Sequence, residues 1–474
     1  MKKRIIILLA LLLIVTNGIT FWGTRNHYQQ EQIMQPPAET PSDEAEIEEE
    51  LLPLVEVLNI LSERYLEDVS REELIKEAIN GMVNSLDDPQ TNFLDSAHFE
   101  EMMIKIDGSF SGIGIEISEV DGYITIIAPI KDTPGEKAGL LPGDRIIAID
   151  GQDVVGMTTM EAVKLIRGPE GTSVRLTVER EQLTEPLEFQ ITRANIIVPS
   201  VFSELLAEQI GYIQITSFDE HTGQDFQKAI LELETEGMRG LLLDLRNNPG
   251  GLLDQAVLVA QEIIPAGPIT HMVDRDGNVL QTYHSYGTKK AYPMVVLVNG
   301  ASASAAEIIA GAVQDTDAGT LVGTKTYGKA TVQHLESLSQ LGGLRYTVAK
   351  YQTPNGRDIH ENGLEPDVVV ELPDDYYFLQ YGIYSDLKPG DEGGSVLILQ
   401  KMLTALQYPV QETAQYDGQT EKAVRAFQAA HGLAASGAVN QATREELTTQ
   451  LEPLLEEMDL QKKRALEILR TALR

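Results

Sequence analysis

Cysteine is absent from all 474 residues of this sequence, and its absence excludes several kinds of chemistry. No disulfide, thiolate metal site or cysteine nucleophile can form without a sulfhydryl group. Basic residues are scarce, because 37 lysines and arginines stand against 72 aspartates and glutamates, for a formal net charge of −35. A surface of this charge repels phosphate backbones, so we expect no nucleic-acid partner. There is also no His-Glu-x-x-His motif, so the sequence indicates no zinc site.

The N-terminus combines a short positive segment with a long apolar one. The letters "MKKR" precede an apolar stretch from Ile5 to Trp22, which is typical of a signal sequence and is near the shortest length that spans a bilayer. No Ala-x-Ala cleavage site is evident. We therefore predict an uncleaved, single-pass signal-anchor in the cell membrane, with everything after Trp22 outside the cytoplasm. Cleavage followed by secretion is the alternative.

Composition then divides the chain into the segments of a multidomain α/β and α+β protein. Residues 26–50 are polar, acidic and Pro-containing, as in a disordered tether. Ser70 with Glu73 matches the capping box that begins a helix. Further on, short β-rich runs give way to alternating strands and helices, and finally to helices. The predicted order is signal-anchor 1–23, disordered acidic linker 24–50, N-terminal helical segment 51–103, β-rich domain 104–192, α/β core 193–383, small all-α domain 384–450 and an amphipathic helix, packed on a neighbouring domain, 451–474.

Two serines follow one of the strands expected in the α/β core. The apolar runs "RGLLLDLR" and "PMVVLVNG" are typical of buried strands, and ligands gather at loops after the carboxyl ends of such strands. The second run leads into "GASASAAEI", which contains Ser302 and Ser304. A serine hydroxyl is a weak nucleophile that needs a base, and no Gly-x-Ser-x-Gly motif occurs. The nearby histidines lie in no recognisable triad motif; they are His271, His284, His334 and His360.

Lys329 is another candidate for the base, in the Gly-flanked loop "TYGKATVQ". At its ordinary pKa of about 10.4 a lysine is charged and cannot accept a proton. Burial can lower that pKa by about 3–5 units, so serine–lysine catalysis is physically reasonable; the alternative is a solvated loop lysine. The letters "GTKTYGKA" also match the spacing of a phosphate-binding loop. However, Ala330 replaces the Ser or Thr that would hold magnesium, and a strand pattern follows, so we reject that interpretation.

Five stretches together resemble the carboxy-terminal processing peptidases, also called tail-specific proteases. In the family's order they are "SLDDPQTNFL", "DLRNNPGG", "NGASASAAEIIAGAVQD", "VGTKTYGKATVQ" and "TPNGRDIHENGLEPDVVV", across roughly residues 50–375. The resemblance implies a serine protease core in which Ser304 is the nucleophile, Lys329 the base and Gln333 the residue that orients the lysine amine. It implies no cofactor and no metal. Ala306 stands where the family commonly has a serine, and we expect only a small packing change.

Backbone amides near Ser304 are candidate oxyanion donors. Ser304 falls where a helical pattern starts, and free N–H groups and the helix dipole favour negative charge there, so the Ala305 amide is one candidate. Gly250 and Gly251 let a backbone approach the substrate, and the resemblance places a second oxyanion amide in their loop. Loss of such a donor typically costs about 10²–10³ in rate.

Three other polar residues near the serine receive structural interpretations. We interpret Ser302 as a hydroxyl that caps the same helix. Glu307 and Asp315 are interpreted as a solvated helix face or local ion pairs, without a role in catalysis.

The β-rich domain resembles PDZ domains over roughly residues 104–182. "SFSGIGIEI" matches their carboxylate-binding loop, and "AGLLPGDRIIAIDGQDV" continues the resemblance. Gly112 and Gly114 would free backbone amides to bind a terminal carboxylate, and the strand edge from Ile113 to Ile115 would pair with an extended peptide. A protein with a free, apolar C-terminus is thus the expected ligand.

Arg167, in "LIRGPEG", is a possible regulatory residue of this domain. The resemblance implies a PDZ module that selects substrates and can gate the active site, and Arg167 could link the two states electrostatically. The alternative is a favourable charge at a helix C-terminus.

The all-α region at 384–450 resembles the peptidoglycan-binding domain of bacterial cell-wall enzymes. "YDGQTEKAVRAFQAAHGL" and "SGAVNQATREELTTQL" carry the resemblance, which makes peptidoglycan an expected partner. Such folds can also serve as interaction modules without glycan binding.

Together these observations predict an exported serine endopeptidase that recognises a protein C-terminus and cleaves by a Ser-Lys-Gln mechanism. One rival is a non-catalytic, wall-attached PDZ scaffold, against which intact Ser304, Lys329 and Gln333 argue. A second is a transpeptidase-like enzyme, which would need a Ser-x-x-Lys pair that "SAAE" lacks. The N-terminal helices could form a homodimer.

Overall fold

A computed structural model describes residues 43–474 apart from positions 121, 181–182 and 339–340. The chain divides into two compact units, one that ends at Ser85 and one that runs from Leu86 to Arg474. The predicted signal-anchor and the linker residues before Asp43 lie outside the described residues. Within the described ranges, no helix is both long enough and apolar enough to cross a bilayer.

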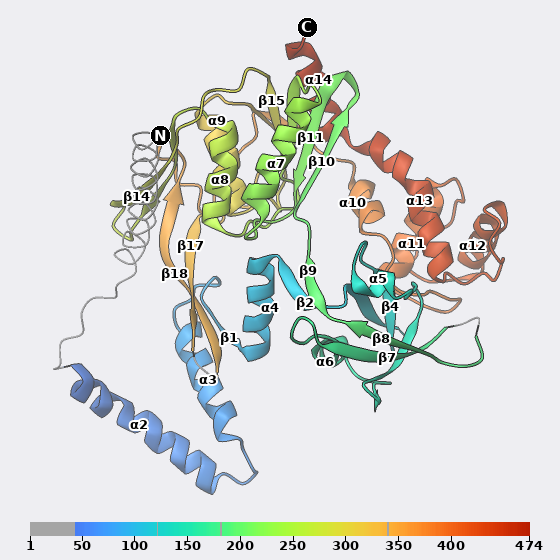
Figure 1. The fold of residues 1–474 in the computed structure, drawn as a ribbon, viewed down its shortest axis with the longest axis horizontal. Coiled ribbons are helices and arrows are strands. Elements are labelled where there is room, and N and C mark those ends of the chain that lie inside the picture. Colours follow the sequence, from blue (N-terminus) through green and yellow to red (C-terminus); the bar gives the residue numbers. More distant parts are fainter. Residues whose placement is uncertain (1–42, 121, 181–182, 339–340) are drawn as a thin grey trace, which may run out of the picture. The chain divides into compact units, whose positions relative to one another are not determined.

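The first unit contains two helices in its described part, α2 (Asp43–Arg64) and α3 (Arg71–Asn84) (Figure 1). Ser70 caps α3 by accepting a hydrogen bond from the Glu73 amide, as the sequence predicts. The disordered linker was expected to continue to residue 50, but α2 begins at Asp43, so that part of the prediction was wrong. Glu and Ala are good helix formers, and acidic side chains stabilise a helix N-terminus.

The β-rich domain is a six-stranded antiparallel sheet in the order β3-β4-β5-β7-β8, with β6 paired to β5. Helices α5 (Pro134–Lys137) and α6 (Thr159–Ile166) complete it, and buried Ile, Val and Leu side chains form its own core. A separate ladder joins β2 (Ser109–Gly112) to β9 (Ala194–Ile197) where the chain enters and leaves the domain. The strands of the domain's sheet are β3 (Ile115–Val120), β4 (Tyr123–Pro129), β5 (Arg145–Ile149), β6 (Gln152–Asp153), β7 (Ser173–Glu179) and β8 (Leu187–Thr192).

A mainly parallel sheet forms the α/β core, in the order β10-β11-β12-β15-β16-β19. Only β10 runs antiparallel to its neighbour. The strands are β10 (Val201–Leu206), β11 (Ile210–Ile215), β12 (Gly240–Asp244), β15 (Met294–Val298), β16 (Thr320–Gly323) and β19 (Val368–Val369).

Both faces of this sheet are covered, which explains why its strands are apolar throughout. Leu241 and Leu243 of β12 pack into the large core formed with α7, α8 and α9, whereas Leu242 belongs to a second cluster formed with α14. This alternation has the period of two expected of a strand. The helices are α7 (Thr222–Thr235), α8 (Leu253–Ile263), α9 (Ala305–Asp315) and α14 (Leu460–Ala472).

A second sheet, in the order β1-β18-β13-β14, carries the segment that follows Lys329. The strand β17 (Thr331–Ser337) pairs with the long β18 (Gly342–Gln352), and β1 (Asn92–Asp95), from the "SLDDPQTNFL" stretch, pairs with the same strand. The other strands are β13 (Gly267–Val273) and β14 (Val279–Ser285), and α4 (Ser96–Asp107) follows β1.

The C-terminal region is helical, as predicted, but its tail is organised differently. Helices α10 (Asp374–Tyr381), α11 (Gly394–Ala405), α12 (Gly418–Ala430) and α13 (Gln441–Met458) surround a separate apolar core.

The tail was expected to be one helix over 451–474, whereas α13 ends at Met458 and α14 starts at Leu460. Asp459 leaves the helical conformation and its carboxylate accepts the Lys462 amide, which caps α14. The expected packing on a neighbouring domain is observed, on the core sheet.

Candidate active site

Ser304 lies at a strained turn between β15 and α9. Its φ of 55° and ψ of −116° make it a non-glycine residue with positive φ, directly before the first residue of the helix. Such conformations cost free energy and persist only where the surroundings enforce them, commonly at active sites. The turn therefore has the strained strand-to-helix character of a nucleophile elbow, although the Gly-x-Ser-x-Gly motif is absent.

Gly250 lies against this turn more closely than any side chain would permit. A Cβ atom on Gly250 would lie 2.6 Å from Cβ of Ser304, 2.8 Å from the Ala303 carbonyl oxygen and 2.9 Å from the Ala305 nitrogen. Gly250 also has a φ of 96°, which disfavours other residues. The structure thus brings together the glycine loop and the serine turn, which the sequence predicts to share one site.

Glu307 is buried at the centre of the site, so its interpretation as a solvated helix residue was wrong. One carboxylate oxygen accepts the Ser304 amide at 3.0 Å and the Lys329 amide at 2.8 Å. The other oxygen accepts the Thr326 hydroxyl at 2.6 Å and the Gly328 amide at 2.8 Å. A single carboxylate therefore holds the backbones of the serine and the lysine together. Asp315, by contrast, forms an ion pair with Arg357, as one of the expected alternatives.

Tyr351 holds the same two residues by their carbonyl groups. Its buried hydroxyl lies 2.9 Å from the Ser304 carbonyl oxygen and also contacts the Lys329 carbonyl oxygen. Glu307 thus binds the backbone N–H groups of Ser304 and Lys329, and Tyr351 binds their backbone carbonyl groups. The backbone of each residue is therefore held on both its N–H and its C=O side. Burial raises the pKa of the Tyr351 hydroxyl, so this group stays neutral.

Lys329 is half-buried, and its surroundings lower the pKa of its amine below the usual value for lysine. Burial is the main cause, because a charged ammonium loses hydration. The positive charge of Arg345 lowers the pKa further, while the carboxylate of Asp88 opposes both effects. Asp88 is itself held by Thr347, whose hydroxyl donates to it at 2.6 Å. Sequence reasoning identified Lys329 but missed the two charges that act on it.

The Glu307 carboxylate brings the backbones of Ser304 and Lys329 together, but among the residues the structure describes no hydrogen bond joins the side chains of Ser304, Lys329 and Gln333. The Gln333 amide donates to the Thr331 carbonyl at 2.9 Å and to the Thr331 hydroxyl at 2.7 Å, rather than to the lysine. The catalytic hydrogen bonds of uncomplexed enzymes are often long and tighten only with substrate, so this arrangement excludes none of the three residues.

The amides proposed for the oxyanion differ in their availability. Within the described part of the chain, the Ala305 N–H has no hydrogen-bond acceptor, although it adjoins the serine. The Gly250 N–H donates to the Asn248 side-chain oxygen at 2.8 Å. Gly251 packs against the Phe218 backbone, where a Cβ would lie 2.1 Å from the Phe218 carbonyl oxygen, so close packing explains glycine at this position.

Ser302 does not cap α9, contrary to the sequence-based interpretation. Its buried hydroxyl donates to the Leu245 carbonyl at 2.8 Å and accepts the Asn299 amide at 2.9 Å. The helix begins only at Ala305, which is too far along the chain for Ser302 to be its cap. Ser302 instead fixes the loop after β15 to the end of β12.

The peptide-binding elements predicted in the β-rich domain lie together at one edge of its sheet. Gly112 ends β2, the buried Ile113 follows, Gly114 adopts a φ of 72°, and Ile115 begins β3, the terminal strand of the sheet. Arg167 lies at the C-cap of α6, with its guanidinium 5.0 Å from the ring centroid of Phe110. Glycine at 114 is required, because a Cβ there would lie 2.4 Å from Cβ of Thr133.

Two of the four histidines considered as possible bases, His271 and His334, make contacts elsewhere. His271 contacts Thr282 and Pro354, and His334 packs against the Tyr346 ring. Across the ranges that the structure describes, no group of three His, Cys, Asp or Glu side chains is arranged to hold a metal ion.

Comparison with known proteins defines the class of this protein. The family model described as Peptidase family S41 matches residues 209–370, and models of a PDZ domain and a peptidoglycan binding domain match 125–180 and 392–447. A further model, described as the activating protease CtpB N-terminal domain, matches residues 13–98. The protein is therefore a serine peptidase with a PDZ domain and a peptidoglycan-binding domain.

Similarity to individual proteins narrows this class. The carboxy-terminal processing proteases CtpA and CtpB of Bacillus subtilis (strain 168) are 38% and 36% identical over 417 residues, which cover 86% of this chain and 87% of each relative. The carboxy-terminal-processing protease of Bartonella bacilliformis is 38% identical over 340 residues, 70% of this chain and 78% of that protein. The chain belongs to the carboxy-terminal processing proteases. The family, the fold class and the two accessory domains predicted from the sequence are confirmed.

Proposed function

We propose that this protease is exported and cleaves proteins by a serine–lysine mechanism. Ser304 attacks the scissile carbonyl while the neutral amine of Lys329 accepts its proton and later returns it to the leaving amine. The Ala305 amide and an amide of the Gly250–Gly251 loop stabilise the oxyanion. Water then hydrolyses the acyl-enzyme. In this mechanism Gln333 leaves Thr331 and orients the lysine amine once substrate is bound.

The observation that carries the proposal is the pair of side chains, Glu307 and Tyr351, that hold the backbones of the two reacting residues; we call this pair the clamp. Glu307 and Tyr351 each bind the backbones of both Ser304 and Lys329, which fixes the position of these two residues relative to one another. The lowered pKa of Lys329 favours the second requirement, an uncharged amine, because only that form can accept the serine proton.

Covalent labelling tests this proposal. A fluorophosphonate should modify the wild-type chain at Ser304, as located by mass spectrometry of its peptides. The labelling rate should rise with pH, because the amine must lose its proton, and the midpoint should lie below the usual lysine pKa. In Arg345→Gln the midpoint should move to higher pH, since a positive charge that favours deprotonation is removed.

A matched variant separates this effect from general damage. Asp88→Asn removes the opposing charge, so its midpoint should move to lower pH. Modification of a different serine, or a labelling rate with no dependence on Lys329, would contradict the mechanism.

We further propose that the PDZ groove between Gly112 and Ile115 binds an apolar protein C-terminus. β3 is the terminal strand of its sheet, the position at which an extended peptide pairs in β-strand addition. Arg167, stacked on Phe110 of the β2 ladder that leads toward the core, links groove occupancy to the active site. A peptide with a free apolar C-terminus should accelerate cleavage of a second substrate, and Arg167→Ala should abolish the acceleration. Unchanged acceleration in that variant would exclude the link.

The remaining proposals concern location and assembly. Residues 1–23 anchor the chain in the membrane. The C-terminal domain binds peptidoglycan. The helix α2 pairs with a second copy through exposed apolar side chains such as Leu52, which is 62% exposed. Secretion after cleavage is the alternative location. Cell fractionation and cross-linking test all three, and recovery as a soluble monomer that does not sediment with cell walls would contradict them.

A further inference from the structure

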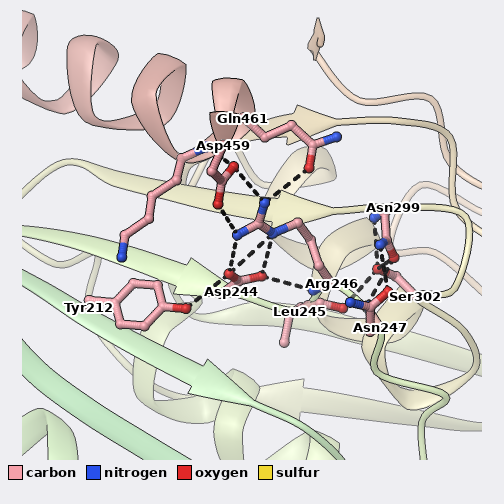
Figure 2. A network of polar contacts seen from close by, with 10 residues as sticks. Tyr212, Asp244, Leu245, Arg246, Asn247, Asn299, Ser302, Asp459 and Gln461 are labelled. Atoms are coloured by element: carbon pink, nitrogen blue, oxygen red, sulfur yellow. Dashed lines mark hydrogen bonds and ion pairs between the residues drawn. The ribbon is translucent and has the colours of Figure 1, made fainter. Parts of the chain in front are cut away.

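The C-terminal tail contributes the side chains of Asp459 and Gln461 to a buried polar network around Arg246 (Figure 2). Arg246 lies four residues before Gly250 in the chain. Arg246, 11% exposed, donates to Asp459 through both terminal nitrogens, at 2.8 and 2.9 Å. It also donates to Gln461 at 3.2 Å and to Asp244, at the end of β12, at 2.7 Å. The strand end and the tail thus hold one guanidinium from two sides.

This network places one positive and two negative charges in a buried site. Asp244 and Asp459 are both buried, and Tyr212 donates to Asp244 at 3.0 Å. The two carboxylates raise the pKa of Arg246 against the effect of burial. A planar guanidinium satisfies two carboxylates at once, whereas a lysine would offer a single point charge. Loss of one carboxylate leaves the remaining groups incompletely paired in a buried site.

The two residues that follow Arg246 in the chain are hydrogen-bonded to the segment that carries the nucleophile. The backbone amide of Asn247 donates to the side-chain oxygen of Asn299 at 3.0 Å (Figure 2). In return, the side-chain amide of Asn299 donates to the side-chain oxygen of Asn247 at 2.9 Å. The Asn248 carbonyl accepts the Ala303 amide at 2.9 Å, one residue before Ser304. The Asn248 side chain holds the Gly250 amide. Displacement of Arg246 would therefore move the loop that lies against Ser304.

We propose that Arg246 is a positioning residue for this loop and that the tail residues Asp459 and Gln461 hold it in place. Two side chains of the tail after the peptidoglycan-binding domain then support the active-site loop, although they lie more than 150 residues beyond Ser304 in the sequence. Gln461 also donates to the Val370 carbonyl at 2.9 Å, so the tail is tied to the last strand of the core where the chain departs for the helical domain. The inference rests on the proposed role of Ser304.

Steady-state kinetics of the full chain with Asp459→Asn test the inference. Asparagine retains the cap of α14 but offers Arg246 a single oxygen and no charge. The value of kcat should fall by about 10–100-fold, because the oxyanion amides are misplaced, with KM within about twofold of wild type. A peptide aldehyde, whose adduct carries the oxyanion, should bind more weakly by the same factor as kcat/KM falls.

Leu469→Ala is the matched control, because it loosens the packing of α14 on the sheet without touching the network. It should lower the melting temperature at least as much as Asp459→Asn and leave kcat unchanged. If Asp459→Asn does not fold, Gln461→Met removes one contact to the same guanidinium and should lower kcat by about 3–10-fold.

Three results would overturn the inference: unchanged kcat in folded Asp459→Asn, a loss carried by KM alone, or an equal loss of kcat in Leu469→Ala. Fluorophosphonate labelling of wild-type Ser304 reports on the proposed function separately. If that labelling succeeds while Asp459→Asn keeps full activity, only the role of the tail is refuted.

Discussion

Replacement of Lys329 by alanine is expected to lower kcat/KM by about 10⁴-fold, toward the upper end of what a positioned general base contributes. Ser304 would keep its strained backbone conformation in this variant. Glu307 and Tyr351 would still hold the loop, because they bind the backbone of residue 329 and not its side chain. The loss should therefore appear without a loss of folding. Rates of peptide-bond cleavage, measured together with thermal unfolding, check both halves of this expectation.

Two lysine-loop variants provide the controls. Lys325 lies four residues earlier, is exposed and pairs with Glu365, so Lys325→Ala should retain nearly full activity. Lys329→Arg preserves the charge but not the function, because a guanidinium stays protonated and cannot accept a proton. Substantial activity in Lys329→Arg would show that the positive charge, and not a neutral amine, is what catalysis requires.

Replacement of Glu307 by glutamine is expected to reduce kcat/KM by about 10²-fold and to destabilise the fold. An amide offers one acceptor oxygen and presents two N–H groups on the other side. At least one backbone amide of the site would then face a donor, at a cost of about 1–3 kcal/mol for each group left unpaired. A misplacement of about 1 Å between the serine and the lysine is sufficient for a rate loss of this size. Cleavage kinetics and chemical denaturation measure the two effects.

Glu361→Gln is the matched control for this variant. Glu361 lies in the loop packed on Gly328, its side chain is exposed, and the described structure shows no hydrogen bond to it. The Glu361→Gln variant should therefore show the wild-type cleavage rate and the wild-type free energy of unfolding. Tyr351→Phe tests the same clamp from the carbonyl side and should also slow cleavage. If both Glu307→Gln and Tyr351→Phe fold and cleave at the wild-type rate, the clamp has no catalytic role.

The missed role of Glu307 shows where sequence reasoning stopped. The pattern Ser-x-x-Glu was recognised at Ser70 and Glu73, where it begins a helix at the surface. The same spacing at Ser304 and Glu307 was overlooked, although it predicts that the glutamate reaches back to the serine amide. No spacing could have shown that Thr326, Gly328 and Lys329 use the remaining acceptor capacity of this carboxylate. Those residues arrive from another part of the chain.

The linker and the tail show the opposite weaknesses of composition and periodicity. An acidic composition suggested disorder to residue 50, yet the same glutamates form the first turns of α2. The amphipathic pattern of the tail correctly indicated a buried face but could not reveal the break at Asp459, because an aspartate is compatible with a helix surface. In the structure Asp459 leaves the helical conformation, caps α14 and pairs with the buried Arg246.

The sequence by itself predicted the apolar strands and the succession of domains, and its resemblance to a known family singled out Ser304, Lys329 and the glycine loop as candidate site residues. The strands could be predicted because they depend on local periodicity, and the resemblance could be seen because its motifs are runs of residues that lie next to one another. Tertiary structure alone decided which carboxylates are buried, which charges act on the lysine amine, and that the tail supports the glycine loop. Burial and electrostatics depend on atoms brought together by packing, and distance along the chain does not specify that arrangement.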